Sequence, residues 1–217
     1  MASLYDTLQT YLHQQGSATR LIPRCHSDFR TLWGAAQQPA LIAHPQTAKD
    51  VQHLVRFSAE NRIEFIVRTG NDYVLHPTEE CSFICIDLRE IDFIHVEDDR
   101  KTVKVGGGIL FRGFTEALAQ ENLGFYEGTV ASSMGNRAWK LLAGFGRFST
   151  LNGPGASQVV GAEVVNARGE LEIVTDGLFG STVSGIIVEL TIKVTPTEQT
   201  ISSILASYNK QSGSRTT

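Results

Sequence analysis

The sequence predicts an α+β fold made of two lobes, and three observations lead to this prediction. A strand–helix–strand pattern occupies residues 40–67, which is typical of a parallel pair of strands joined by a right-handed crossover helix. Antiparallel hairpins are predicted at residues 93–105 and 159–174. Neither an internal repeat nor a low-complexity linker interrupts the sequence, and the predicted lobes divide near Lys101.

The first lobe is predicted from helical and β-rich spacing. Residues 4–15 carry leucines at helical intervals, and Gly16 closes this helix. A short strand at 40–43 leads to Thr47, a good N-cap residue for the next helix. A β-rich run at 63–67 completes the unit.

The second lobe is predicted mainly as antiparallel strands. A strand at 82–87, still within the first lobe, precedes the hairpin at 93–105, whose turn is Asp98–Asp99. Three glycines at 106–108 then lead into a helix, whose apolar face is marked by Phe111, Phe114, Leu118 and Leu123. The last predicted strand covers residues 186–194. We therefore divide the chain into an N-terminal helix and lead-in (1–39), a first lobe (40–100), a second lobe (101–200) and a polar tail (201–217).

Composition and charge exclude several classes of function. Of 217 residues 41% are hydrophobic, too many for a disordered chain. Nineteen basic and 23 acidic side chains leave a formal net charge of −4, so nucleic acid is not an expected partner. No apolar run approaches the ~20 residues that span a bilayer, and no secretory signal is visible. We expect a cytoplasmic protein without a membrane partner.

Cysteine usage points to thiols rather than to disulfides or metal ligands. Cys25, Cys81 and Cys85 cannot all pair, and their spacing does not match a zinc site. We expect buried structural thiols in a reducing compartment, and no metal site.

Two glycine-containing loops are candidates for ligand binding. The turn 68–73 follows a buried strand, and consecutive backbone N–H groups in such a turn can form a concave anion site. The loop 128–135, with the glycines of 143–146, is long and rich in small residues, which is uncommon unless the loop is functional. The alternatives are a plain strand-ending turn and a surface loop.

Seven segments, in order, resemble one known family. They are Ile42–Val51, Val67–Gly70, Ile86–Ile91, Val103–Gly108, Gly144–Ser149, Val160–Val165 and Ser184–Leu190. Together they are similar to the FAD-binding domain of vanillyl-alcohol-oxidase-type and berberine-bridge-enzyme-like (PCMH-type) flavoproteins. The resemblance implies two α/β lobes with FAD between them. Members of the family continue into a substrate domain, and we expect the 217 residues of this sequence not to include one.

The resemblance also implies which residues contact the cofactor. The family's histidine anchor for the flavin falls on Asp72 and its cysteine anchor falls near Ala131, so FAD is expected to be non-covalent and able to dissociate. The cofactor-binding residues implied are Arg68, Thr69, Gly70, Asn71, Asp72, Tyr73, Gly128, Thr129, Ala131, Ser132, Ser133, Gly135, Gly144, Gly146, Gly185 and Ile186.

Three functions remain open from the sequence. The first is an FAD-dependent oxidoreductase acting on a small organic substrate, with a separate substrate-domain subunit or as a homo-oligomer. The second is a flavin-free isomerase or cyclase that uses the cleft between the lobes, favoured by the bulk of Trp139 and Lys140 where the family is glycine-rich. The third is a binding protein without chemistry. Asp72, Tyr73 and His76 are weak candidates for an acid–base cluster, with a solvated loop as the alternative.

Overall fold

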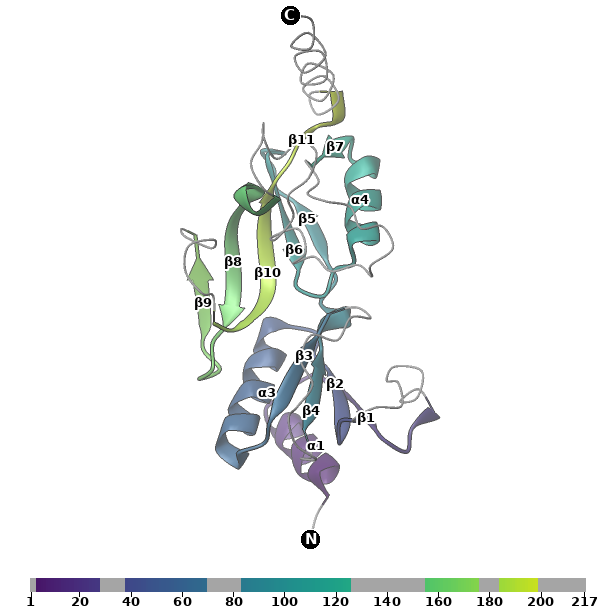
Figure 1. Cartoon of the computed structure of the whole chain (residues 1–217), viewed down its shortest axis with the longest axis vertical. Coiled ribbons are helices and arrows are strands. Elements are labelled where there is room, and N and C mark those ends of the chain that lie inside the picture. Colours follow the sequence, from purple (N-terminus) through teal and green to yellow (C-terminus); the bar gives the residue numbers. More distant parts are fainter. Residues whose placement is uncertain (1–2, 28–37, 70–82, 126–154, 176–183, 199–217) are drawn as a thin grey trace, which may run out of the picture.

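The protein has two lobes, each built on its own β-sheet (Figure 1). The structure is a computed structural model that describes residues 3–27, 38–69, 83–125, 155–175 and 184–198. It mixes helices and strands as the sequence predicts. The candidate loops 70–73 and 128–146, together with His76, Trp139 and the tail 201–217, lie outside the described residues.

The first lobe is a four-stranded sheet with two helices. The strand order is β1-β2-β4-β3, in which β1 is antiparallel to β2 while β2 and β3 both run parallel to β4. The elements are α1 (Leu4–Gln14), β1 (Arg20–Pro23), β2 (Leu41–His44), α3 (Ala48–Asn61), β3 (Phe65–Arg68) and β4 (Ile84–Asp87).

The strand order corrects the prediction that the strands flanking α3 are neighbours. β2 and β3 do run in the same direction, but β4 lies between them. Burial explains this order, because all four residues of β4 are buried whereas Val67 of β3 is 39% exposed. A strand that is apolar on both faces is stabilised most at the centre of a sheet. The sequence analysis also missed β1, a short edge strand that ends in Pro23, which suits an edge.

The helix α3 begins at the predicted N-cap. The Thr47 hydroxyl accepts a hydrogen bond from the Asp50 amide, and the Asp50 carboxylate accepts one from the Thr47 amide, which forms a capping box. α1 and α3 pack on one face of the sheet. Their leucines and Val51 form a core with alternate strand residues, among them Leu41, Ala43 and Ile84.

The second lobe is a five-stranded antiparallel sheet in the order β5-β6-β10-β8-β9. Both predicted hairpins are confirmed by the pairing of β5 with β6 and of β8 with β9. The elements are β5 (Ile94–Val96), β6 (Thr102–Gly106), α4 (Phe111–Gln120), β7 (Leu123–Gly124), the 3₁₀ helix η2 (Gly155–Gln158), β8 (Val159–Val165), β9 (Leu171–Val174), β10 (Ile186–Lys193) and β11 (Thr195–Pro196). The 3₁₀ helix η1 (Leu88–Glu90) precedes them and packs with the core of the first lobe.

Three details differ from the sequence-based expectations. The second sheet begins with β5, before the boundary expected at Lys101, because the 94–106 hairpin pairs with β10. Leu123 leaves the helical face and joins β7, since α4 ends at Gln120 and Asn122 adopts a positive φ of 54°. Cys85 is buried as expected, but Cys25 is exposed in the turn after β1.

The two lobes share a tightly packed seam. Backbone of Gly106 and Gly108 lies so close to Ile91 and Leu88 of the first-lobe core that a Cβ at either glycine would come within 2.1 Å of a carbonyl oxygen. Gly107 lies equally close to Ile187, within the second sheet. Val165, Ile186 and Val188 of the second sheet belong to the core of the first lobe. The Gln52 side chain of α3 donates a hydrogen bond of 2.9 Å to the Gly169 carbonyl in the β8–β9 turn. The carboxyl end of the first sheet is therefore held firmly against the second lobe.

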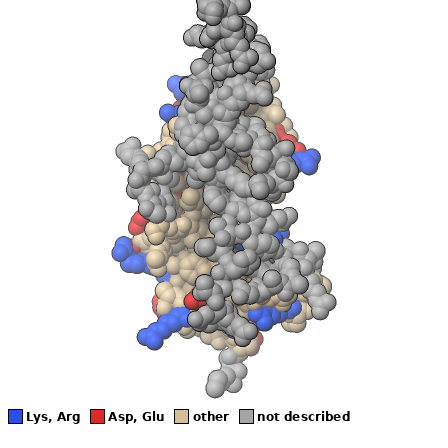
Figure 2. Space-filling model, in the orientation of Figure 1, with Lys and Arg blue, Asp and Glu red and all other residues tan. Residues whose placement is uncertain are grey.

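Charges of both signs are interspersed on the described part of the face in Figure 2, rather than gathered into one field. None of the helices in the described part of the chain is long and apolar enough to cross a membrane.

Candidate functional site

Three buried polar side chains lie in one row at the carboxyl end of the first sheet. His44 ends β2, Asp87 ends β4 and Arg68 ends β3. Arg68 is directly paired with Asp87 in the register, and His44 follows the Ala43–Ile86 pair, so it is level with Asp87. Residues level with one another on paired strands project from the same face. Their exposed fractions are 0%, 0% and 5% for His44, Asp87 and Arg68.

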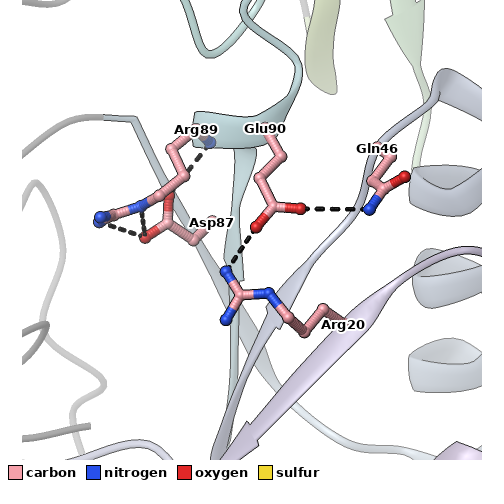
Figure 3. Close-up of polar contacts among 5 residues, drawn as sticks. All are labelled: Arg20, Gln46, Asp87, Arg89 and Glu90. Carbon is pink, nitrogen blue, oxygen red and sulfur yellow. Dashed lines mark hydrogen bonds and ion pairs between the residues drawn. The ribbon is translucent and has the colours of Figure 1, made fainter. Parts of the chain in front are cut away.

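Asp87 is held between two arginines. Its Oδ2 accepts hydrogen bonds from Arg89 Nε at 3.0 Å and Arg89 Nη2 at 2.7 Å, and its Oδ1 accepts one from the Arg89 amide at 3.2 Å (Figure 3). Arg68 Nε lies 3.8 Å from the same Oδ2, within ion-pair distance but beyond hydrogen-bond distance. One carboxylate therefore faces two guanidinium groups.

A second ion pair, between Glu90 and Arg20, lies at the same edge of the first sheet. Glu90 accepts a hydrogen bond from Arg20 of β1 and another from Gln46 Nε2 at 3.4 Å, and it lies between them in Figure 3. Arg20 and Glu90 are more exposed than Asp87, with side-chain exposures of 50% and 26%. Water therefore screens this pair more than it screens Asp87.

His44 is buried without a hydrogen bond. Neither of its ring nitrogens has a partner within the part of the chain that the structure describes. Burial lowers the pKa of His44 below its ordinary value, and the nearby Asp87 acts in the opposite direction. The ring is therefore neutral at pH 7. Among the described residues, the three arginines of this cluster (Arg20, Arg68 and Arg89) and its two carboxylates (Asp87 and Glu90) sum to a charge of +1.

A net positive edge at the ends of parallel strands can bind an anion. Open α/β sheets bind ligands outside the carboxyl ends of their strands. Arginine is suited to phosphate because its planar fork of N–H groups matches two phosphate oxygens. The described residues contain no cluster of three metal-binding side chains.

Four of the predicted cofactor-binding residues lie in the described part of the chain. Arg68 and the partly buried Thr69 lie at the end of β3. Gly185 has φ +158°, and a Cβ there would lie 2.6 Å from both Val164 Cγ1 and the Val165 carbonyl oxygen, so packing against β8 already requires glycine. The Ile186 side chain packs in the core of the first lobe. The remaining predicted site residues lie outside the described ranges, and their roles stay predictions.

The sequence analysis did not single out His44, Asp87 or Arg89. The sequence did contain a signal for two of them. His44 directly follows the short apolar run 41–43, and Asp87 directly follows the apolar run 84–86. Arg89 gave no such signal, since its role depends on the turn of η1 that brings it back to Asp87.

The sequence of this chain matches a known domain and known enzymes. Residues 39–175 match a family model described as an FAD binding domain. The FAD-linked oxidoreductase aurO of Gibberella zeae is 31% identical over 166 residues, covering 73% of this chain and 33% of the relative. (R)-6-hydroxynicotine oxidase of Paenarthrobacter nicotinovorans is 27% identical over 140 residues, covering 64% of this chain and 30% of the relative. The chain thus spans about a third of these two relatives.

Solved structures give the same fold. Berberine bridge enzyme from Eschscholzia californica superimposes with a TM-score of 0.71 at 20% identity, over 87% of this chain and 43% of that protein. At this identity the likeness concerns the fold. The family match covers more than half of the sequence and agrees with the two-lobed architecture. The chain therefore belongs to the FAD-binding domain family of PCMH-type flavoproteins, whose members include FAD-linked oxidoreductases.

Proposed function

We propose that this chain binds FAD non-covalently at the carboxyl edge of the first sheet, as the cofactor-holding part of an oxidoreductase acting on a small organic substrate. The observation that carries the proposal is Arg68, a buried guanidinium at the end of β3, in a cluster whose described side chains sum to a charge of +1. The Arg68 charge is already paired with Asp87, and the planar fork of N–H groups in arginine matches two phosphate oxygens. FAD carries two phosphates, so the residues present fit the cofactor.

The chain's own residues contribute binding and orientation. Arg68 is suited to pair with the pyrophosphate, and the neutral ring of His44 adds no charge to the edge. When bound, FAD supplies the electron-transfer chemistry, while the protein sets its position and electrostatics. Non-covalent binding is supported by Asp72 and Ala131, since neither a carboxylate nor a methyl group can replace the family's histidine and cysteine anchors.

The substrate contacts are proposed to come from a second copy of this chain or from a separate subunit. Light scattering on the purified protein tests the first of these sources, because a homo-oligomer has a multiple of the 23.8 kDa mass of one chain. A monomer at all working concentrations would exclude a second copy of this chain as the source.

The central experiment is a titration with FAD. We expect the purified protein to show flavin absorbance, or to acquire it on addition of FAD, and to release the flavin into the supernatant on acid precipitation. Flavin that stays with the precipitate would contradict non-covalent binding. A colourless protein that takes up no FAD would overturn the proposal and favour a flavin-free isomerase, cyclase or binding protein.

A matched pair of variants tests the role of Arg68. Arg68→Gln removes the buried charge, and Arg20→Gln removes an exposed charge from the same edge. We expect Arg68→Gln to raise the Kd for FAD about tenfold or more, the scale of one hydrogen bond to a charged group. Arg20→Gln should change it far less. Equal effects of the two variants would mean that only the overall charge of the edge matters.

A further inference from the structure

Asp87 shares its carboxylate unequally between two arginines. Arg89 makes all three of the hydrogen bonds described above, two of them to Oδ2. Arg68 faces the same Oδ2 across 3.8 Å. The carboxylate therefore holds Arg68 by charge alone, without a hydrogen bond between them.

This attraction acts where water is excluded. Asp87 is 0% exposed and Arg68 is 5% exposed, so solvent screens their interaction weakly. Both residues are the last of paired parallel strands, so the sheet fixes their backbones relative to each other. The hydrogen bonds from Arg89 in turn fix the Asp87 carboxylate.

We propose that Asp87 is a positioning residue for the cofactor: it holds the Arg68 guanidinium in the place from which Arg68 binds the pyrophosphate. Arg89 supports this role by orienting the Asp87 carboxylate. This inference rests on the proposed function, because it concerns the same cofactor. It adds a residue that does not itself touch the cofactor.

Positioning and simple charge effects predict opposite results for the substitution Asp87→Asn. By charge alone, removing a carboxylate from the edge makes it more positive and tightens the binding of an anion. If Asp87 positions Arg68, the same substitution releases the guanidinium and weakens binding. The direction of the change in Kd therefore separates the two explanations.

Glu90→Gln is the matched control. It also removes one carboxylate charge from this edge, but the partners of Glu90 are Arg20 and Gln46. We expect this variant to bind FAD as tightly as the unaltered protein or slightly more tightly.

A double-substitution cycle links the effect to Arg68. If Asp87 acts through Arg68, Asp87→Asn should have little further effect on the Kd in a protein that already carries Arg68→Gln. A purely structural role for Asp87 would lower stability in both backgrounds and would not depend on Arg68.

The experiment is FAD titration of the full chain and these variants, at a temperature where circular dichroism shows each to be folded. We expect Asp87→Asn to raise the Kd about tenfold or more. A Kd equal to or below that of Glu90→Gln would overturn the inference while leaving the proposed function intact. Absence of FAD binding by the unaltered protein would overturn both. If Asp87→Asn does not fold, Arg89→Lys replaces it, because lysine keeps the charge but loses the two-pronged contact. An unchanged Kd for that variant would also contradict the inference.

Discussion

Substitution of Gly107 by alanine should destabilise the protein, because the Gly107 backbone lies directly against β10 of the second sheet. A Cβ at Gly107 would lie 2.1 Å from the Ile187 carbonyl oxygen, whereas real Cβ atoms keep at least 3.0 Å. One backbone segment must therefore move by about 0.9 Å, and overpacking of this kind costs ~1–3 kcal/mol. The same movement strains the 2.8 Å hydrogen bond from the Gly107 amide to the Val188 carbonyl, worth ~1 kcal/mol. We expect a loss of about 3 kcal/mol.

Thermal unfolding followed by circular dichroism measures this effect. A loss of about 3 kcal/mol corresponds to a fall in Tm of about 6–12 °C for a chain of this size. Gly113→Ala is the control, since Gly113 lies inside α4 and a Cβ there would meet only Ile109 Cδ1, at 3.9 Å. Alanine should stabilise that helix by ~0.5–1 kcal/mol. If Gly107→Ala raised the Tm as Gly113→Ala does, the close packing of Gly107 against β10 would be refuted.

Three further predictions concern single side chains. Asp50 is 3% exposed and accepts hydrogen bonds from Ser17, Gln46 and Thr47, so Asp50→Ala should cost about 2–4 kcal/mol in urea unfolding. Asp6→Ala, which breaks the exposed capping box of α1, should cost only about 1 kcal/mol, and equal losses would contradict the role of burial. His53 is buried with no hydrogen-bond partner in the described chain, and burial lowers its pKa. The folded state then binds fewer protons than the unfolded state, whose histidine pKa is about 6.5, so stability should fall as the pH drops below about 6.5. His53→Phe should reduce this pH dependence in unfolding experiments between neutral and mildly acidic pH, and an unchanged slope would exclude His53 as a cause. Asp72→Asn should lower the Kd for FAD, because a negative charge near a phosphate costs on the order of 1 kcal/mol, and an unchanged or higher Kd would show that Asp72 points elsewhere.

Local features of the fold could be predicted from the sequence because they depend on neighbouring residues. The Thr47 N-cap begins α3 where it was expected, since its partner Asp50 is only three residues away. The 159–174 hairpin could be predicted because residues 166–169, which begin with asparagine and end with glycine, suit a tight turn between two β-rich runs. In the structure the hairpin forms, and Gly169 has a positive φ of 72°. The order of strands in the first sheet was not predictable in this way, since the insertion of β4 between β2 and β3 depends on which strand is buried on both faces.

In the candidate site too, the sequence could identify only what depends on neighbouring residues. Arg68 was identified from the sequence because it stands beside a glycine turn in a segment that resembles the family pattern. His44, Asp87 and Arg89 become part of a site only when three strands align in parallel and η1 folds back.

By itself, the sequence determined most of the helices and strands, several of their capping and turn residues, and the family of the chain, since these depend on short segments and their order. Only the tertiary structure decided that Asp87 lies between two arginines and that Gly107 lies against β10. The physical reason is that the neighbouring atoms set both the strength of an electrostatic interaction and the space available for an added methyl group. At this edge of the sheet, those surroundings come from strands that are far apart in the chain.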